Sequence, residues 1–178
     1  MRKVLLLGAG NSRNLHLAPL GKETEPAEIV TTDVDPFSKP DVWCDLNFRP
    51  LPFGTEEFDE IHAYEVLEHL GKQGDWRGFF DEFSEYWRIL KPDGFLLGSC
   101  PAITSPWLWG DPGHSRTLQP ETLSFLQQSS YIEQVGVTHL TDYRKVYKAD
   151  FKVVMLDTKT DQFWFGLQAV KPSRWRLP

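Results

Sequence analysis

A short apolar run that breaks into a glycine pair constrains the fold of this chain more than any other feature. Residues 4–7 read Val-Leu-Leu-Leu, and Gly8-Ala9-Gly10-Asn11-Ser12 follows directly. The run predicts a buried strand, and the two glycines let the backbone pass close to a ligand. With a helix expected from about Ser12, the turn predicts a site for an anionic or carboxylate-bearing group. A glycine turn made only for packing fits the same residues.

The composition fits one soluble domain. The chain has 178 residues, of which 40% are hydrophobic, enough for one core and too few for two typical domains, so we expect 1–178 to be a single domain. A net charge of -6 disfavours nucleic acid as a partner. The first apolar run is too short for an export signal, and no run approaches the roughly 20 residues of a membrane span. With only Cys44 and Cys100 as cysteines, we expect a cytoplasmic protein without a membrane anchor.

Strand and helix patterns alternate along the chain, which predicts the α/β class with a doubly wound sheet. Asp75 is expected to cap the next helix, and Pro92 with Gly94 to end it. The aromatic residues of this helix fall on one face, which predicts packing on the sheet and no ligand. Two β-rich runs near the end predict an antiparallel hairpin that closes one sheet edge. The predicted strands are residues 3–8, 28–32, 42–44, 58–64, 95–99, 132–140, 151–156 and 162–170, and the predicted helices start near residue 12, start after Asp75 and span 120–128.

The residues that follow the predicted strands form one candidate surface, because in a doubly wound sheet the ligand lies across the carboxyl ends of the strands. Asp33 comes a little over twenty residues after the glycines, where a carboxylate accepts the hydroxyl protons of a ribose. Asp35, which precedes a proline, also fits a turn. The segments concerned are Gly8-Ala9-Gly10, Asp33-Val34-Asp35, Asp45-Leu46, Tyr64-Glu65 and Ser99-Cys100.

Six blocks in this order resemble the class I S-adenosylmethionine-dependent methyltransferases, in particular the type 11 group. Each block is common alone, and the ordered set is specific. The blocks are Leu5-Leu6-Leu7-Gly8-Ala9-Gly10, Thr32-Asp33-Val34-Asp35-Pro36, Cys44-Asp45-Leu46, Leu51-Pro52-Phe53 with Phe58-Asp59-Glu60-Ile61, Glu65-Val66-Leu67-Glu68-His69-Leu70, and Leu90-Lys91-Pro92-Asp93-Gly94.

The resemblance implies a Rossmann-like sheet of about seven strands, mostly parallel, with an antiparallel strand in the C-terminal hairpin. It also implies S-adenosylmethionine as cofactor, with the ribose on Asp33 and the adenine amino group on Asp45. The methionine part is expected along the glycine turn. The positions assigned to the cofactor on this basis are Gly8, Ala9, Gly10, Asp33, Val34, Asp45, Leu46 and Tyr64.

The chain departs from the family pattern in ways that bear on the cofactor. Leu6 stands where relatives usually carry an acid, and Ser12 stands where they carry a third glycine. The chain also begins almost on its first strand, so we expect an exposed cofactor. A lid is expected from the loop Pro101–Leu118, which is rich in Pro, Gly and Trp, or from another subunit.

Methyl transfer is an in-line displacement at a sulfonium, so close and aligned placement of the acceptor supplies much of the rate. A base matters only for an acceptor that must lose a proton. His114, in a segment that resembles the family's Asp-Pro-x-His-x-Arg motif, is a candidate base or substrate contact, or a loop histidine bonded to backbone. Glu65 and Tyr64 are the other catalytic candidates. We therefore predict a methyltransferase that acts on a small molecule or a side chain.

Glu65, Glu68 and His69 have the i, i+3, i+4 spacing of one helix face and resemble the metal ligands of some O-methyltransferases. Together with His114 they could hold a divalent ion. The same residues occur in metal-free relatives as a helix start and as polar packing groups, and on this basis no metal is predicted. The tryptophans Trp107 and Trp109 could stack an acceptor or bury a subunit contact, which leaves a homodimer open.

Other functions fit the residues less well. A nicotinamide oxidoreductase needs a third glycine at the position of Arg13. Methylation of a DNA base needs a Pro-Pro-aromatic or Pro-Cys motif after the fourth strand, where Ala63-Tyr64-Glu65 stands. A non-catalytic binding module that keeps the fold remains the alternative, because Leu6 and Ser12 depart from the family pattern.

Overall fold

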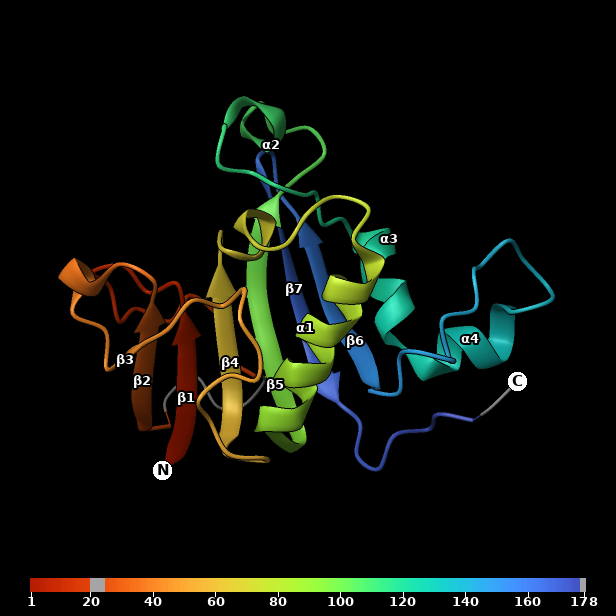
Figure 1. Cartoon of the computed structure of the whole chain (residues 1–178), viewed down its shortest axis with the longest axis horizontal. Helices are drawn as coiled ribbons and strands as arrows, with labels where there is room; N and C mark the ends of the chain where they lie inside the picture. Colours follow the sequence, from red (N-terminus) through yellow and green to blue (C-terminus); the bar gives the residue numbers. More distant parts are fainter. Residues whose placement is uncertain (20–24, 177–178) are drawn as a thin grey trace.

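The computed structural model describes residues 1–19 and 25–176 and is built on one seven-stranded sheet (Figure 1). The strand order is β3-β2-β1-β4-β5-β7-β6. Strand β7 runs antiparallel to both β5 and β6, and the other neighbouring pairs are parallel. The α/β class and the C-terminal hairpin are thereby confirmed. The strands are β1 (Arg2–Leu7), β2 (Ala27–Asp33), β3 (Val42–Trp43), β4 (Phe58–Tyr64), β5 (Leu90–Pro101), β6 (Phe151–Thr158) and β7 (Gln162–Ala169).

The main helix, α1, lies across one face of the sheet (Figure 1). The Asp75 carboxylate caps it by accepting the Gly78 N–H at 3.0 Å, as predicted from the position of that residue. Pro92 and Gly94, expected to end the helix, lie beyond its end in β5. No helix in the described part of the chain is long and apolar enough to span a bilayer. The helices are α1 (Trp76–Ile89), α2 (Trp107–Gly110), α3 (Pro120–Leu123) and α4 (Gln128–Gln134), with 3-10 turns η1 (Pro36–Ser38), η2 (Leu67–His69) and η3 (Ser124–Leu126).

The helix predicted from about Ser12 is wrong. Residues 11–19 form no helix. The backbone N–H groups of His16 and Leu17 donate to the Tyr64 hydroxyl, at 3.0 and 3.1 Å, where a helix would direct them to carbonyls four residues earlier. A side chain from a distant strand thus replaces local helical bonding.

The strand predicted at 132–140 is also wrong, and the helix predicted at 120–128 is broken. The chain forms α3 and η3, turns at Gln127 and continues into α4. The Gln128 N–H donates to the Asp150 carboxylate at 3.0 Å, and the Gln128 amide donates to the Ala149 carbonyl at 2.9 Å. These contacts with a segment some twenty residues away start α4 where local periodicity predicted an end.

The aromatic face of α1 packs into the core, as predicted. Phe80, Phe83 and Tyr86 are almost fully buried, and Trp76 and Trp87 pack partly buried against the same core. They meet apolar side chains of the central strands, so this face is occupied by packing. Burial of an aromatic side chain contributes several kcal/mol, on the order of 3–5 for a Phe-to-Ala truncation.

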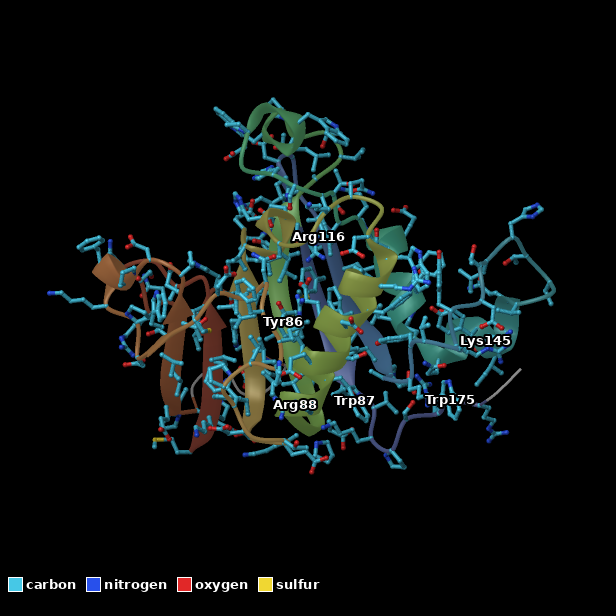
Figure 2. The ribbon with its side chains drawn as sticks, viewed as in Figure 1. Tyr86, Trp87, Arg88, Arg116, Lys145 and Trp175 are labelled. Carbon is cyan, nitrogen blue, oxygen red and sulfur yellow. The ribbon has the colours of Figure 1, made fainter. Side chains whose placement is uncertain are left out.

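A buried ion pair connects α1 to the carboxyl end of the sheet. The Arg116 guanidinium donates to Glu82 of α1 at 2.7 Å and to the Leu67 carbonyl of η2 at 2.9 Å, and both charged residues are buried. Arg49 lies 3.2 Å from the other Glu82 oxygen. In Figure 2, Arg116 lies near the upper end of α1, above Tyr86. Since a buried charge is costly unless it is paired, this contact holds the segment around Arg116 in place.

We expect Arg116→Met to lower the free energy of unfolding by about 3 kcal/mol, because it removes a main partner of a buried carboxylate. Urea denaturation followed by tryptophan fluorescence measures the change. The control is Lys159→Met, which removes an exposed pair with Asp157 at 3.8 Å and should leave the midpoint unchanged. Equal effects of the two substitutions would contradict a structural role for Arg116.

Candidate functional site

The two glycines after β1 play different parts. Both have a positive φ, +55° at Gly8 and +52° at Gly10. A Cβ on Gly8 would lie 2.4 Å from Val66 Cγ2, whereas a Cβ on Gly10 would meet no atom within 4 Å. Packing therefore explains Gly8, and open space at Gly10 leaves room for the close approach of a ligand.

Asp33, at the end of β2, faces this turn. Its carboxylate accepts the Gly10 N–H at 2.7 Å and the Asp35 N–H at 2.8 Å. A carboxylate has about four lone-pair positions, so two remain for hydroxyl donors. Asp35 instead caps η1 by accepting the Phe37 N–H at 2.9 Å, which is the turn role considered for it.

The end of β3 supplies the next part of the rim. Asp45 accepts both the backbone and the side-chain N–H of Asn47 through one oxygen, at 2.8 and 3.0 Å. Leu46 is buried in the core, whereas Val34 is 59% exposed. Trp43, which the sequence analysis did not select, is exposed too and donates its indole N–H to the Val34 carbonyl at 2.9 Å. The exposed apolar surface at this rim therefore comes from Val34 and Trp43.

Tyr64, at the end of β4, belongs to a buried polar chain. Its hydroxyl accepts two backbone N–H groups and bonds His62 Nδ1, and His62 Nε2 lies 2.9 Å from Glu60, which pairs with Arg2. Burial raises the pKa of Tyr64 to about 12 and lowers the pKa of His62. The hydroxyl therefore stays protonated at neutral pH and anchors residues 16–17. No pattern in the sequence indicated this hydrogen-bond network.

The turn after β4 is not the α-helix that the i, i+3, i+4 spacing predicts. Glu65 has a φ of +52°, and its carboxylate accepts the Ser99 hydroxyl of β5 at 2.7 Å. Glu68 and His69 follow in the 3-10 turn η2. Backbone strain at a non-glycine residue next to a cavity is typical of functional sites.

Residues 113–117 are hydrogen-bonded to η2, which places His114 beside Glu68 and His69. The Ser115 N–H donates to the Glu68 carbonyl at 2.9 Å, and His69 Nδ1 lies 3.1 Å from the Gly113 carbonyl. The rings of His69 and His114 meet edge to face, with centroids 4.7 Å apart. The sequence-predicted residues Glu65, Glu68, His69 and His114 thus share one cavity.

The cavity has a volume of about 430 Å³ and lies at the carboxyl ends of β4 and β5. Glu68 is fully buried beside it, and burial raises its pKa to about 7. Asp161, from the turn before β7, and Ser105 complete the wall, and sequence reasoning selected neither. The lining residues are Glu65, Glu68, His69, Pro101, Ser105, Trp107, Asp111, His114, Asp161 and Gln162.

The loop between β5 and α3 forms the outer wall of the cavity, and α2 projects beyond the sheet (Figure 1). Trp107 lines the cavity although 66% of it is exposed, and Trp109, 75% exposed, does not line it. The rim formed by the turns after β1 and β2, by contrast, has exposed Gly8, Gly10 and Val34. Val66 joins the two parts, because it packs on Gly8 and lies next to Glu65 in the chain.

Comparison with known protein families identifies the family of this chain from its sequence. Residues 5–98 match the family model described as a methyltransferase domain. No curated protein sequence matches the chain. Residues 5–98 include the glycine turn, Asp33, Asp45, η2 and most of β5.

Solved structures share the fold at low identity. An Archaeoglobus fulgidus SAM-dependent methyltransferase has a TM-score of 0.57 and 16% identity, over 94% of this chain and 86% of that one. The Bradyrhizobium japonicum N-methyltransferase NodS, solved with S-adenosyl-L-homocysteine, has a TM-score of 0.54 and 15% identity, over 94% and 78%. A Haloferax volcanii putative methyltransferase, solved with a methyltransferase activator, has a TM-score of 0.54 and 14% identity, over 95% and 83%.

The two glycines should respond differently to alanine. Gly8→Ala should cost about 3 kcal/mol of unfolding free energy, because it adds a clash with Val66 to an unfavourable φ. Gly10→Ala should cost only about 1 kcal/mol, since only the φ is unfavourable. Chemical denaturation of both variants measures the difference. A larger loss for Gly10→Ala would show that the packing assigned to Gly8 is wrong.

The buried state of His62 predicts a pH-dependent stability. Its pKa in the folded protein is lowered, so the unfolded chain binds the proton more readily once the pH falls below about 6.5. The contribution of neutral His62 to the free energy of unfolding is complete above that pH. Below it, this contribution falls by up to about 1.4 kcal/mol per pH unit for one proton. Denaturant midpoints between about pH 5 and pH 8 measure this loss. His62→Gln should flatten this slope, and substitution of the exposed His139 by Gln should not.

Proposed function

This chain belongs to the methyltransferase-domain family, and we propose that residues 1–178 act as one domain that methylates a small molecule bound in the cavity beside η2. The cofactor is S-adenosylmethionine, and the reaction is methyl transfer. One observation carries the assignment of the site: Asp33 is held between Gly10 and Asp35 at the carboxyl end of β2, next to open space. A cavity of about 430 Å³ is of a size that suits a small acceptor.

The residues present fit the cofactor. Asp33 has lone pairs free for the two ribose hydroxyls, and Val34 offers an exposed apolar surface to the adenine. Asp45 keeps one carboxylate oxygen outside its bonds with Asn47, which suits the adenine amino group. Leu6 is buried in β1, so this chain provides no charge at the position where relatives usually have an acid.

When bound, S-adenosylmethionine supplies an activated methyl group on a sulfonium. The chain's own part is to hold the acceptor in line, because proximity and alignment account for much of the rate in such a displacement. Trp107 offers a flat apolar wall for the acceptor. His114 Nδ1 lies 3.3 Å from the Leu108 carbonyl and so carries a proton, which leaves Nε2 as the nitrogen able to accept one from an acceptor hydroxyl.

Glu65 has a supporting part in this proposal. Its carboxylate accepts the Ser99 hydroxyl and lines the cavity, where it orients a donor group of the acceptor. Tyr64 contributes through its ring and through the segment it anchors, since its hydroxyl is already fully bonded. A subunit contact through the exposed Trp109 stays a prediction.

Asp33→Ala should weaken S-adenosylmethionine binding at least tenfold, because the ribose loses its acceptor. Isothermal titration calorimetry measures the affinity, and a thermal-shift series should show a cofactor-dependent rise in Tm that the variant lacks. Asp35→Ala is the matched control, since this carboxylate caps η1, and it should bind the cofactor normally.

Wild-type protein that binds no S-adenosylmethionine, or Asp33→Ala that binds it as tightly as wild type, would refute the site. An acceptor screen with a coupled assay for S-adenosylhomocysteine then tests the reaction. Cofactor binding without turnover across the screen would favour the non-catalytic module.

A further inference from the structure

The side chains of Glu68, His69 and His114 converge at the base of the cavity. One ligand atom from each lies within 4.8 Å of the others. Around a zinc ion, tetrahedral ligands at 2.0–2.1 Å lie about 3.3 Å apart. The side chain of His69 is exposed, so the core does not prevent it from approaching the other two. These residues come from segments 45 positions apart in the chain and meet only through the fold.

Backbone carbonyls set the tautomer of both imidazole rings. His69 Nδ1 lies 3.1 Å from the Gly113 carbonyl, and His114 Nδ1 lies 3.3 Å from the Leu108 carbonyl. A carbonyl only accepts, so each Nδ1 carries the proton and each Nε2 keeps its lone pair. A carbonyl that accepts from the other ring nitrogen and so fixes the tautomer is the usual companion of a metal-binding histidine.

The Glu68 carboxylate needs a partner that the described residues do not provide. Its side chain is fully buried, and neither oxygen has a hydrogen-bond partner of normal geometry among residues 1–19 and 25–176. Only the backbone N–H of Glu68 itself and the Cys100 thiol interact with the carboxylate. A buried polar group without a good hydrogen bond is destabilising, and more so when it is charged. A cation in the cavity would remove that cost.

The charge of the cavity favours a cation as well. Glu65, Asp111 and Asp161 line it together with Glu68, and its lining includes no lysine or arginine among the described residues. Four carboxylates around one small cavity repel one another unless a positive charge lies between them. The excess of carboxylates therefore agrees with a bound cation. The three ligands themselves are identified from the geometry of their side chains.

The backbone that carries the three side chains is held firmly. Ser115 donates its N–H and its hydroxyl to the Glu68 carbonyl, at 2.9 and 3.3 Å, and Arg116 donates to the Leu67 carbonyl. The two segments therefore keep their relative position without a metal. Such preorganisation is what a metal site needs from its scaffold.

We propose that Glu68, His69 and His114 bind a first-row divalent metal ion, with its remaining coordination positions open to the cavity. Two imidazoles and one carboxylate suit zinc and its neighbours in the first row better than magnesium or calcium. Glu65 is not part of this set, because its carboxylate is bonded to Ser99. With the metal bound, His114 Nε2 is a ligand and no longer the proton acceptor described above. The metal site stands on its own geometry and does not require the proposed methyl transfer.

Titration of chelator-treated protein with Co²⁺ alone tests the site. Wild-type protein should develop visible d–d absorption that saturates at one ion per chain, and added Zn²⁺ should displace it. His69→Ala should weaken Co²⁺ binding by about 100-fold or more, because it removes a ligand. Glu68→Gln, nearly the same shape, should do the same. His139→Ala, in an exposed loop, is the matched control and should bind Co²⁺ as wild type does.

Thermal unfolding without metal separates binding from folding, and His69→Ala should keep the wild-type Tm because that side chain is exposed. Asp33→Ala should keep its Co²⁺ affinity while it loses S-adenosylmethionine, so failure of the metal site and failure of the proposed function give different results. The proposal is overturned if wild-type protein binds neither ion, or if His69→Ala binds Co²⁺ as tightly as wild type.

Discussion

The buried guanidinium of Arg116 makes the ion pair on which the cavity beside η2 depends. It connects Glu82 of α1 with the Leu67 carbonyl of η2, and so joins the core helix to the turn that follows β4. Because a buried cation needs its partners, the segment 113–117 has little freedom to move away. His114 lies in that segment, so the position of a residue beside the cavity follows from an ion pair in the core.

The rim after β1, β2 and β3 is built differently. Its groups come from strand ends, and they are held by short hydrogen bonds to the backbone, such as those of Asp33 with Gly10 and Asp35. This rim is open, and the helix predicted after the glycine turn is replaced by a segment anchored on Tyr64. Val66 packs on Gly8, so the turn after β4 adjoins the turn after β1.

Sequence reasoning succeeded where the interactions are local and failed where they link distant segments. Strand β4 was predicted with its observed bounds and the Asp75 cap was identified, because alternating burial and capping are local patterns. The helix from Ser12 failed because the Tyr64 hydroxyl takes backbone donors of that segment. The strand at 132–140 failed because Asp150 binds the Gln128 N–H at the start of α4, and this helix runs to Gln134. Likewise, nothing local indicated that His62 would be buried between Tyr64 and Glu60.

What the sequence by itself determined is the order of the elements and the identity of the residues at the strand ends, including the glycine turn, Asp33 and Asp45. Parallel strands direct their carboxyl ends to one edge, so that knowledge is enough to bring these residues together at one rim. Only the tertiary structure decided how residues 65–69 are used. Helical spacing grouped Glu65, Glu68 and His69, to which His114 was added. The folded chain instead bonds Glu65 to Ser99 and brings the other three together. The reason is physical: hydrogen bonds from a segment 45 residues away set the backbone of η2, and local periodicity carries no information about them.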